Sequence, residues 1–150
     1  MKVVPYLIFA GTAEEAMNFY VESLGAKVQF INRFGDSPIP STEDQKNQIL
    51  HASFTIGESL VMTSDGKPGE KYSGNNISLS IDFTDVSEMK EKFDKVAEGG
   101  SITMPVQDTF WGATFGMLID KFGISWMFNC DKKPQAVNKE AQDKTMEITV

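Results

Sequence analysis

His51 is the residue whose side chain is best suited to chemistry, and it is the only histidine of the chain. An unperturbed imidazole has a pKa of roughly 6.5, so His51 could accept a proton near neutral pH. A general base also needs a substrate or an orienting group within hydrogen-bond reach. Glu58 and Asp65 are carboxylates that could orient it, but a lone histidine on a strand more often has a structural role. The sequence therefore assigns no catalytic residue and offers His51 as the best candidate.

The chain lacks the residues of the common metal sites. Zinc and similar ions are usually held by several histidine, cysteine and carboxylate side chains, whereas His51 and Cys130 are each the only residue of their kind. We expect neither a metal ion nor a cofactor. A single cysteine also excludes an internal disulfide, which suits a reducing cytosol. No group that would activate Cys130 is evident, so we expect its thiol to be inert.

Length and charge exclude several classes of protein. The 150 residues suit one domain with a substantial core. The formal charge of −7 argues against nonspecific nucleic-acid binding, which needs clustered Lys and Arg. No apolar run reaches the roughly 20 residues of a membrane helix, and the first residues do not form a secretory signal. We expect a soluble cytoplasmic protein.

The strands and helices that would position these residues form a series that occurs twice along the chain. The first copy has a strand over 3–10, a helix whose apolar face includes Met17 and Tyr20, and three further strands. Thr12 and Glu15 predict a capping box at the start of the helix, and Gly25 predicts its end. The further strands are predicted at 27–33, 48–56 and 59–63, with a hairpin turn at Gly57-Glu58 and a surface loop over 34–46.

The second copy begins with a strand over 76–83. Asp85 and Glu88 form a second predicted capping box, Met89 and Phe93 lie on the apolar face of the helix, and Gly99-Gly100 ends it. The last strands are predicted at 101–106, 113–119 and 124–130. Beyond them lies a charged tail, 131–150, in which only 146–150 could pair as a strand and much could be disordered.

Short motifs along 3–129 resemble the vicinal oxygen chelate superfamily, and its PhnB-like branch in particular. They are Pro5-Tyr6-Leu7-Ile8-Phe9, Ala13 to Tyr20, Leu24-Gly25-Ala26, Trp111-Gly112, Gly116, Asp120-Lys121-Phe122-Gly123 and Trp126. The resemblance implies an α+β fold of two βαβββ modules, which form a curved, cup-shaped mixed sheet with helices on its outer face, and a homodimer. Module 1 would span about 1–65 and module 2 about 76–130, within one domain over 1–130.

In metal-dependent members of this superfamily four ligands line the cup. Carried onto this chain, they fall on Pro5, on Met62 or Thr63, on Asn76 and on Met127. Proline has no donor side chain, and Met or Asn alone hold Ni²⁺, Zn²⁺ or Fe²⁺ poorly. The resemblance therefore implies a cup without the ion that lyase and dioxygenase relatives use.

Alternation along the strands predicts which side chains face the cup. With Pro5 and Asn76 inside, Leu7 and Phe9 would face inward, and so would Ser78 and Ser80. The same reasoning places Ser125, Met127 and Asn129 inside, and Trp126 and Phe128 against the helices. The predicted ligand-binding residues are Leu7, Phe9, His51, Met62, Asn76, Ser78, Trp111, Phe115 and Met127.

The aromatic group Phe110, Trp111 and Phe115 has three interpretations. The rings could stack on a planar ligand or form a dimer contact, but we favour a place in the core because aromatic residues bury so much area. The resemblance implies Arg at the position of Thr114 in many relatives. If that Arg binds an anionic ligand in them, the same ligand is not expected here.

The sequence therefore predicts a metal-free PhnB-like protein that binds a small molecule, without an established reaction. The alternatives are a metal-dependent lyase or dioxygenase, a drug-sequestering protein like those of bleomycin resistance, an enzyme that uses His51, and a structural dimer with a vestigial cup. A methyltransferase label is also used for this branch. However, Gly99-Gly100 follows a helix and opens a strand, which is not the context of an adenosyl-cofactor turn.

Overall fold

The structure, a computed structural model, describes residues 1–132. Module 1 consists of β1 (Tyr6–Phe9), α1 (Ala13–Leu24), β2 (Lys27–Arg33), β3 (Ile49–Ile56) and β4 (Ser59–Asp65), with two short 3-10 turns, Phe34–Asp36 and Glu43–Gln45, in the predicted surface loop. Module 2 consists of β5 (Leu79–Phe83), α2 (Val86–Ala97), β6 (Ser101–Asp108), β7 (Ala113–Ile119) and β8 (Ser125–Asp131).

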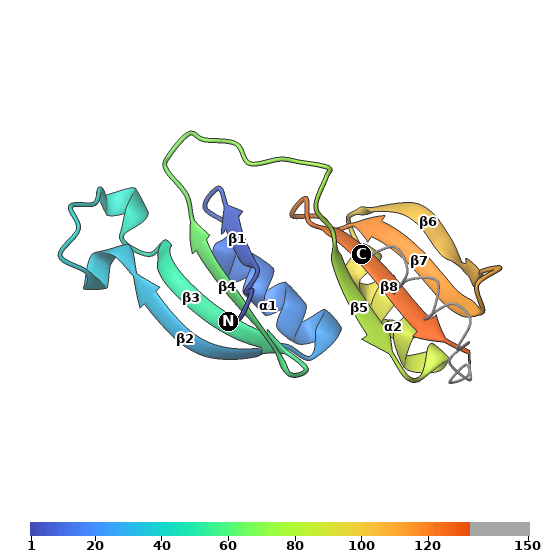
Figure 1. The fold of residues 1–150 in the computed structure, drawn as a ribbon. Helices are drawn as coiled ribbons and strands as arrows, with labels where there is room; N and C mark the ends of the chain where they lie inside the picture. The colour runs from blue at the N-terminus through green and yellow to red at the C-terminus, as the bar shows by residue number, and fades with distance from the viewer. Residues whose placement is uncertain (133–150) are drawn as a thin grey trace, which may run out of the picture.

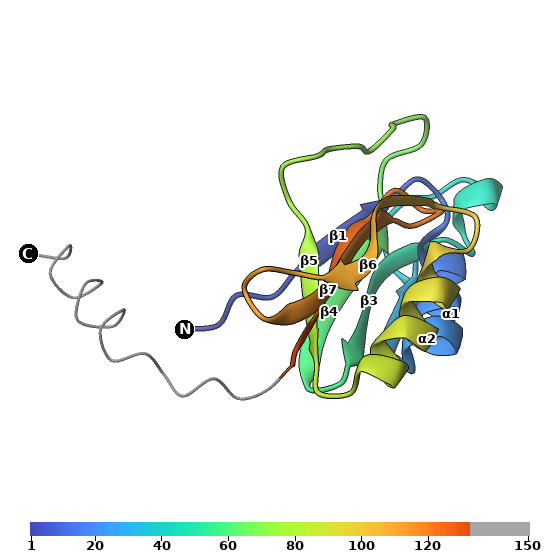
Figure 2. The ribbon, with the colours of Figure 1, turned by 90° about the vertical axis from the view of Figure 1, so that its right-hand side faces the viewer.

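Each module forms one four-stranded mixed sheet. The strand orders are β1-β4-β3-β2 and β5-β8-β7-β6, and in each sheet the first strand pairs in parallel with the last. Both helices cover the same side of the two sheets and leave the opposite side open (Figures 1 and 2). The prediction of an α+β fold with two βαβββ modules is confirmed.

The core lies between the sheets and the helices. Met17 and Tyr20 of α1 and Met89 and Phe93 of α2 are buried, as the helical spacing predicts. Alternate residues of the strands meet them, among them Phe54 of β3 and Val61 of β4, and Trp126, Phe128 and Cys130 of β8. These side chains form one hydrophobic cluster across both modules, so the modules share a core.

Asp120 joins the two modules through a buried carboxylate. Its Oδ2 accepts hydrogen bonds from the Tyr20 hydroxyl of α1 at 2.6 Å and from the Trp126 indole of β8 at 2.8 Å. Its Oδ1 accepts from the backbone N–H groups of Phe122 and Ile124, which closes the turn before β8. Burial, together with the adjacent carboxylate, raises the pKa of Tyr20 far above its usual range, so this hydroxyl remains a donor.

The helix starts differ from the predicted capping boxes. The Thr12 side chain makes no capping hydrogen bond, and Asp65 at the end of β4 instead accepts from the backbone N–H of Ala13. A partner distant in the sequence therefore replaces the local cap. In module 2, Asp85 accepts from the N–H of Ser87 as expected, but Glu88 pairs with Lys92 and does not complete the box.

Both first strands are shorter than predicted. β1 starts at Tyr6 because Pro5 has no N–H to donate, although its carbonyl still accepts from Met62 N. β5 starts at Leu79, so Asn76 and Ser78 lie before the strand. Within residues 1–132 no helix is long and apolar enough to span a membrane. Asp131 of the predicted tail ends β8, and the strand predicted at 146–150 lies outside the described residues.

Candidate functional site

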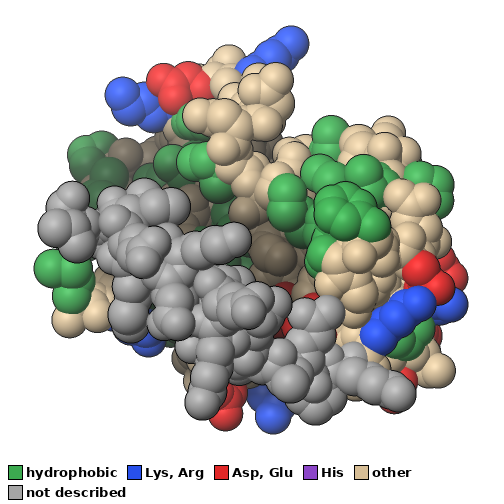
Figure 3. Space-filling view, turned by 45° about the vertical axis from the view of Figure 1, so that its right-hand side comes forward, with side chains coloured by type: hydrophobic (Ala, Val, Ile, Leu, Met, Phe, Trp, Pro, Cys, Tyr) green, Lys and Arg blue, Asp and Glu red, His purple; other side chains and the backbone are tan. Residues whose placement is uncertain are grey.

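The face of the two sheets opposite the helices, here called the open face, carries polar and aromatic side chains. In module 2, Ser80 lies beside Met127, and Asp82 beside Asn129, as the parallel pairing of β5 with β8 requires. Hydrophobic side chains lie on both sides of a central hollow of the molecule (Figure 3). The predicted orientation of β8 agrees with burial, because Trp126 and Phe128 are buried while Met127 is only partly so.

The predicted orientation of β1 is wrong. Phe9 is buried in the core and Leu7 packs against that core, whereas Tyr6 and Ile8 are exposed on the open face. Alternation was counted from Pro5, which lies outside the strand, so every side chain of β1 was assigned to the opposite face. The second metal-ligand position carried over from the superfamily falls on Met62 or Thr63, and the structure distinguishes these two residues. Met62 pairs with Tyr6 on the open side, while Thr63 is buried and donates to Leu7 O.

His51 lies on the open face of module 1 next to two aromatic rings. Its Nδ1 is 3.3 Å from the Tyr6 hydroxyl, and its ring centroid is 5.8 Å from that of Tyr6 and 6.1 Å from that of Phe30. We call Tyr6, Ile8, Phe30, His51 and Met62 the His51 patch. The sequence analysis did not identify Tyr6 as the partner of His51, because their contact depends on the pairing of β1 with β4.

Neither predicted carboxylate orients His51. Asp65 is buried and accepts hydrogen bonds from the N–H groups of Ala13 and Ile49, so it is committed to the backbone. Glu58 lies in the turn between β3 and β4 and is exposed. Among the described residues, Tyr6 is the side chain that forms a hydrogen bond with His51. Within residues 1–132, no carboxylate orients the imidazole as in a His–carboxylate pair.

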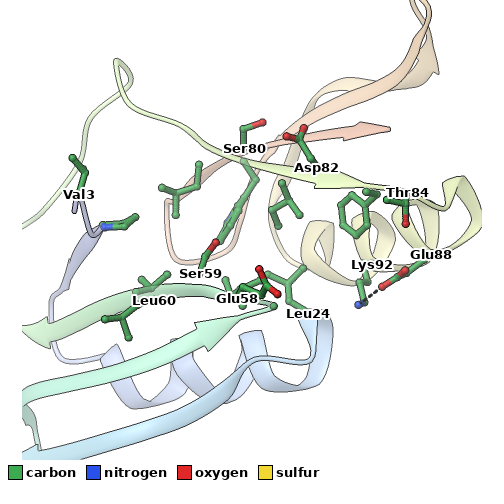
Figure 4. A pocket seen from close by; sticks show the side chains of 18 of the residues that line it. Val3, Leu24, Glu58, Ser59, Leu60, Ser80, Asp82, Thr84, Glu88 and Lys92 are labelled. Carbon is green, nitrogen blue, oxygen red and sulfur yellow. Dashed lines mark hydrogen bonds and ion pairs between the residues drawn. The ribbon is translucent and has the colours of Figure 1, made fainter. Parts of the chain in front are cut away.

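A cleft of about 760 Å³ lies between the modules. Glu58, Ser59 and Leu60 lie on one side of it, and Ser80 and Asp82 of β5 lie on the other (Figure 4). Somewhat more than half of its lining is apolar, and the apolar side chains include Val3, Pro5, Leu24, Ile56, Val61, Leu79, Ile81, Phe83 and Trp126. The cleft exists because β1 covers β4 only from Met62 onward, which leaves the first part of β4 facing β5.

Carboxylates outnumber ammonium groups around this cleft. Glu58, Asp82 and Glu88 line it together with Lys2 and Lys92, and Lys92 already pairs with Glu88 at 2.7 Å. Within residues 1–132, neither Glu58 nor Asp82 takes part in an ion pair. Asp82 accepts a hydrogen bond from the Asn129 amide at 3.3 Å. The cleft therefore offers a ligand more hydrogen-bond acceptors than donors.

The four carried-over metal positions do not form a ligand set. Pro5 lines the cleft without a donor side chain, and Asn76 is exposed in a bend before β5. Met62 and Met127 each lie on the open face of their own sheet, and thioethers are soft ligands that suit copper(I) better than Zn²⁺ or Fe²⁺. In the described part of the chain, no three His, Cys, Asp or Glu side chains are grouped to hold an ion.

The turn between β6 and β7 exposes two aromatic side chains, which we call the aromatic tip. Phe110 is 97% exposed and Trp111 is 49% exposed, so their predicted place in the core is wrong. Phe115 of β7 is partly buried, with its ring centroid 5.8 Å from that of Trp111. Thr114 is buried, and its hydroxyl donates a hydrogen bond to Asp108.

Cys130 is buried at the end of β8. Burial, helped by the nearby Asp131 and Asp85 carboxylates, raises the pKa of its thiol. The thiol is therefore protonated near neutral pH, which agrees with the expectation of an inert cysteine.

Comparison with known proteins places this chain in a family. Residues 1–128 match the family model described as 3-demethylubiquinone-9 3-methyltransferase. The chain belongs to this family. Protein YjdN of Escherichia coli (strain K12) is 36% identical over an alignment 143 residues long, and the match covers 89% of this chain and 97% of that protein.

Solved structures of similar proteins agree with this assignment. Protein PA1353 from Pseudomonas aeruginosa has 41% sequence identity and a TM-score of 0.79, over 87% of this chain and 98% of that chain. A PhnB protein from Bacillus cereus, whose description carries the same methyltransferase label, has 30% identity and a TM-score of 0.73, over 87% and 99%. A member of the glyoxalase/bleomycin resistance protein/dioxygenase superfamily from Sphaerobacter thermophilus shares the fold, with 19% identity and a TM-score of 0.56 over 87% and 98% of the chains. This member of the 3-demethylubiquinone-9 3-methyltransferase family thus has the glyoxalase fold in its PhnB-like form.

Proposed function

We propose that this protein binds a small organic molecule in the cleft between its modules and that binding needs no metal ion. The observation that supports this is the cleft itself, about 760 Å³ in volume, with walls that are apolar over somewhat more than half of their area and polar over the rest. Pockets for small ligands typically measure about 300–1,000 Å³ and combine apolar walls with a small number of placed polar groups. The cleft between the modules has a volume in this range and combines apolar walls with polar groups, although its polar share is larger.

The lining favours one kind of ligand. The apolar side chains of Leu24, Leu60 and Trp126 suit an aliphatic or aromatic body. The carboxylates of Glu58 and Asp82, which take part in no ion pair within residues 1–132, suit hydroxyl, amide or ammonium groups that donate hydrogen bonds. The net charge of −7 acts in the same direction and disfavours anions. Sequestration of a drug-like molecule would be one form of this function.

The donor set supports binding without a metal ion, because Pro5, Met62, Asn76 and Met127 do not suit Zn²⁺, Ni²⁺ or Fe²⁺. The family description names a methyl transfer, but the glycine pair of this chain does not lie in the kind of turn that binds an adenosyl cofactor. Gly99 and Gly100 lie between α2 and β6, whereas a nucleotide-type cofactor turn would follow a strand and open a helix.

Thermal-shift screening would test the proposal. A panel of amphipathic amines, alcohols and carboxylates of matched size should raise the melting temperature in that order, because a ligand stabilises the folded state by mass action. Ser80→Phe should abolish the shift, since Ser80 lines the cleft and a phenyl ring would fill it. Ser73→Phe, at an exposed loop position, is the matched control. If no compound shifts the protein, or if S80F leaves the shift unchanged, the proposal is wrong. A stoichiometric transition metal in the purified protein would contradict its metal-free part.

A further inference from the structure

Three methionines lie next to one another across the sheet of module 2. Met117 of β7 is the direct strand partner of Met127 of β8. Met104 of β6 is the direct partner of Met117, at a point between two shifts in the β6–β7 register. Directly opposite residues of antiparallel strands have their Cβ atoms about 4.5–5.5 Å apart on the same face of the sheet. We call Met104, Met117 and Met127 the methionine row.

The methionine row belongs to the open face of module 2. All three side chains are only partly buried, and none of them belongs to the hydrophobic cluster or packs against it. In β8 the neighbours Trp126 and Phe128 are buried on the helix side, so Met127 points to the opposite side. The three thioethers therefore lie outside the core, with part of their surface accessible to a ligand.

Three neighbouring thioethers suit a soft metal ion. Thioether sulfur is a neutral, polarizable donor of the kind that selects Cu(I), whereas carboxylate, carbonyl and water oxygens suit Mg²⁺ and Ca²⁺. Zn²⁺ is held by cysteine, histidine and carboxylate side chains. A methionine side chain is unbranched and has three rotatable bonds, so sulfurs from three adjacent strands can turn toward one ion. Met117 in the middle of the row would supply the central sulfur.

The charges of this sheet favour a cation. None of β5, β6, β7 and β8 contains Lys or Arg, whereas β5 contributes Asp82 and β8 contributes Asp131. The Asn129 amide donates to both carboxylates at 3.3 Å. Asn129 lies two residues after Met127 in β8 and thus on the same face of the sheet. Negative charge beside neutral sulfur donors raises the local concentration of a cation.

The two other side chains of the sequence that commonly bind copper lie elsewhere. Cys130 is buried on the helix side of β8, opposite Thr114. His51 lies in β3, within the sheet of module 1. These are the single cysteine and the single histidine of the chain. The methionine row is therefore a donor set of thioethers without a thiolate or an imidazole.

We infer that the methionine row binds one Cu(I) ion on the open face of module 2 through its three sulfur atoms. The row shares Met127 with the four positions carried over from metal-dependent superfamily members, whereas Met104 and Met117 lie outside that set. None of the three methionines lines the cleft between the modules. The Cu(I) site therefore goes beyond the proposed function, whose ligand needs no metal ion.

A competition titration with Cu(I) tests the inference. Protein freed of metal by dialysis against a chelator is titrated with Cu(I), without oxygen and with ascorbate present, in competition with a coloured Cu(I) chelator. The chain should take up one Cu(I) per molecule. Met117→Leu keeps an apolar side chain of similar size but removes the central sulfur. Its affinity should fall at least about tenfold, because loss of a group that merely supports a metal ligand already costs about 10–100-fold.

Met62→Leu is the matched control. Met62 of the His51 patch is also partly buried, but it lies in module 1, where it pairs with Tyr6 and Ser53. Its substitution should leave the Cu(I) affinity unchanged. The affinity should also be equal at pH 6 and pH 8, once protonation of the chelator is taken into account. A thioether has no proton to lose, whereas binding by a thiolate or an imidazole weakens as the pH falls.

Nuclear magnetic resonance identifies the ligands directly. With the methionine methyl groups labelled with carbon-13, Cu(I) should shift three of the eight methyl signals, those of the methionine row. The three signals are assigned from the spectra of Met104→Leu, Met117→Leu and Met127→Leu. A shift confined to other methionines would show that the ion binds elsewhere and would overturn the inference.

The absence of Cu(I) uptake, an unchanged affinity in Met117→Leu, or an equal loss in Met62→Leu would each overturn the inference as well. The thermal-shift screen of the metal-free protein tests the proposed function separately. If Cu(I) binds at the methionine row while no organic compound shifts the melting temperature, the proposed function alone is wrong. If compounds bind in the cleft while Cu(I) does not bind, the Cu(I) site alone is wrong.

Discussion

Modules 1 and 2 have the same order of elements but hold the starts of their helices in different ways. In module 1 a buried carboxylate 52 residues away, Asp65, accepts from the first N–H of α1 and also from Ile49 at the start of β3. In module 2 the exposed Asp85 accepts from Ser87, two residues further along the chain. The topology of the repeat is thus preserved while its contacts are not, and α1 depends on the sheet of its module more than α2 does.

The open faces differ as well. Module 1 presents His51 between two aromatic rings, whereas module 2 presents Ser80, Asp82 and Asn129. The buried Asp120 of module 2 joins the two modules, because it accepts hydrogen bonds from Trp126 of its own module and from Tyr20 of module 1. Substitutions of Asp120, Asp65 and Asp85 measure how far the two modules differ in what stabilises them.

Loss of the Asp120 carboxylate should have the largest effect. Asp120→Ala leaves the Tyr20 hydroxyl and the Trp126 indole buried without an acceptor, and each such group costs about 1–3 kcal/mol. We expect the free energy of unfolding to fall by about 3–5 kcal/mol in urea denaturation. Asp120→Asn keeps one acceptor oxygen and should lose less. Equal stability of both variants and the unaltered chain would show that the modules do not depend on this contact.

Asp65 should come next and should matter more than Asp85. Asp65→Ala removes acceptors from two backbone N–H groups in a buried place, which we expect to reduce the free energy of unfolding by about 2–4 kcal/mol. Asp85→Ala removes an exposed cap of α2, for which about 0.5–2 kcal/mol is typical. Both losses follow from the same denaturation experiment. A larger loss for Asp85 would reverse the comparison of the two helix starts.

The smallest effect should be a pH dependence at the surface of module 1. The hydrogen bonds from Arg33 lower the pKa of Glu14, so this pair stabilises the fold above the unfolded pKa of about 4.3 and loses that stabilisation as the pH falls through the lower, folded pKa. Both side chains are partly exposed, so we expect roughly 0.5 kcal/mol. Chemical denaturation at pH 7 and at pH 3 should show a difference between the unaltered chain and Glu14→Gln only at pH 7. A difference of the same size at both pH values would show that the carboxylate charge is not responsible.

The repeat of strands and helices could be predicted because each depends on local periodicity. Gly25 ends α1 in the left-handed conformation, as its position after the apolar face indicates. The orientation of β1 could not be predicted, because it depends on where the strand starts after Pro5, which is decided by pairing with β4.

The candidate site was predicted less well than the fold. His51 and Met62 lie on one open face, and their predicted role in ligand binding stays a prediction. The cleft depends on how the two modules pack, which no local pattern encodes. Trp111 was expected in the core because it is large and aromatic. Burial of such a residue depends on whether other elements reach the β6–β7 turn, and none of the described elements covers it.

Because Tyr20 and Trp126 share the Asp120 carboxylate as acceptor, each half of the chain depends on the other. Expressed alone, the first half would retain a tyrosine hydroxyl whose acceptor is on the other polypeptide, and it would expose the part of α1 that contacts α2. Two halves produced as separate polypeptides should therefore become ordered only after they are combined.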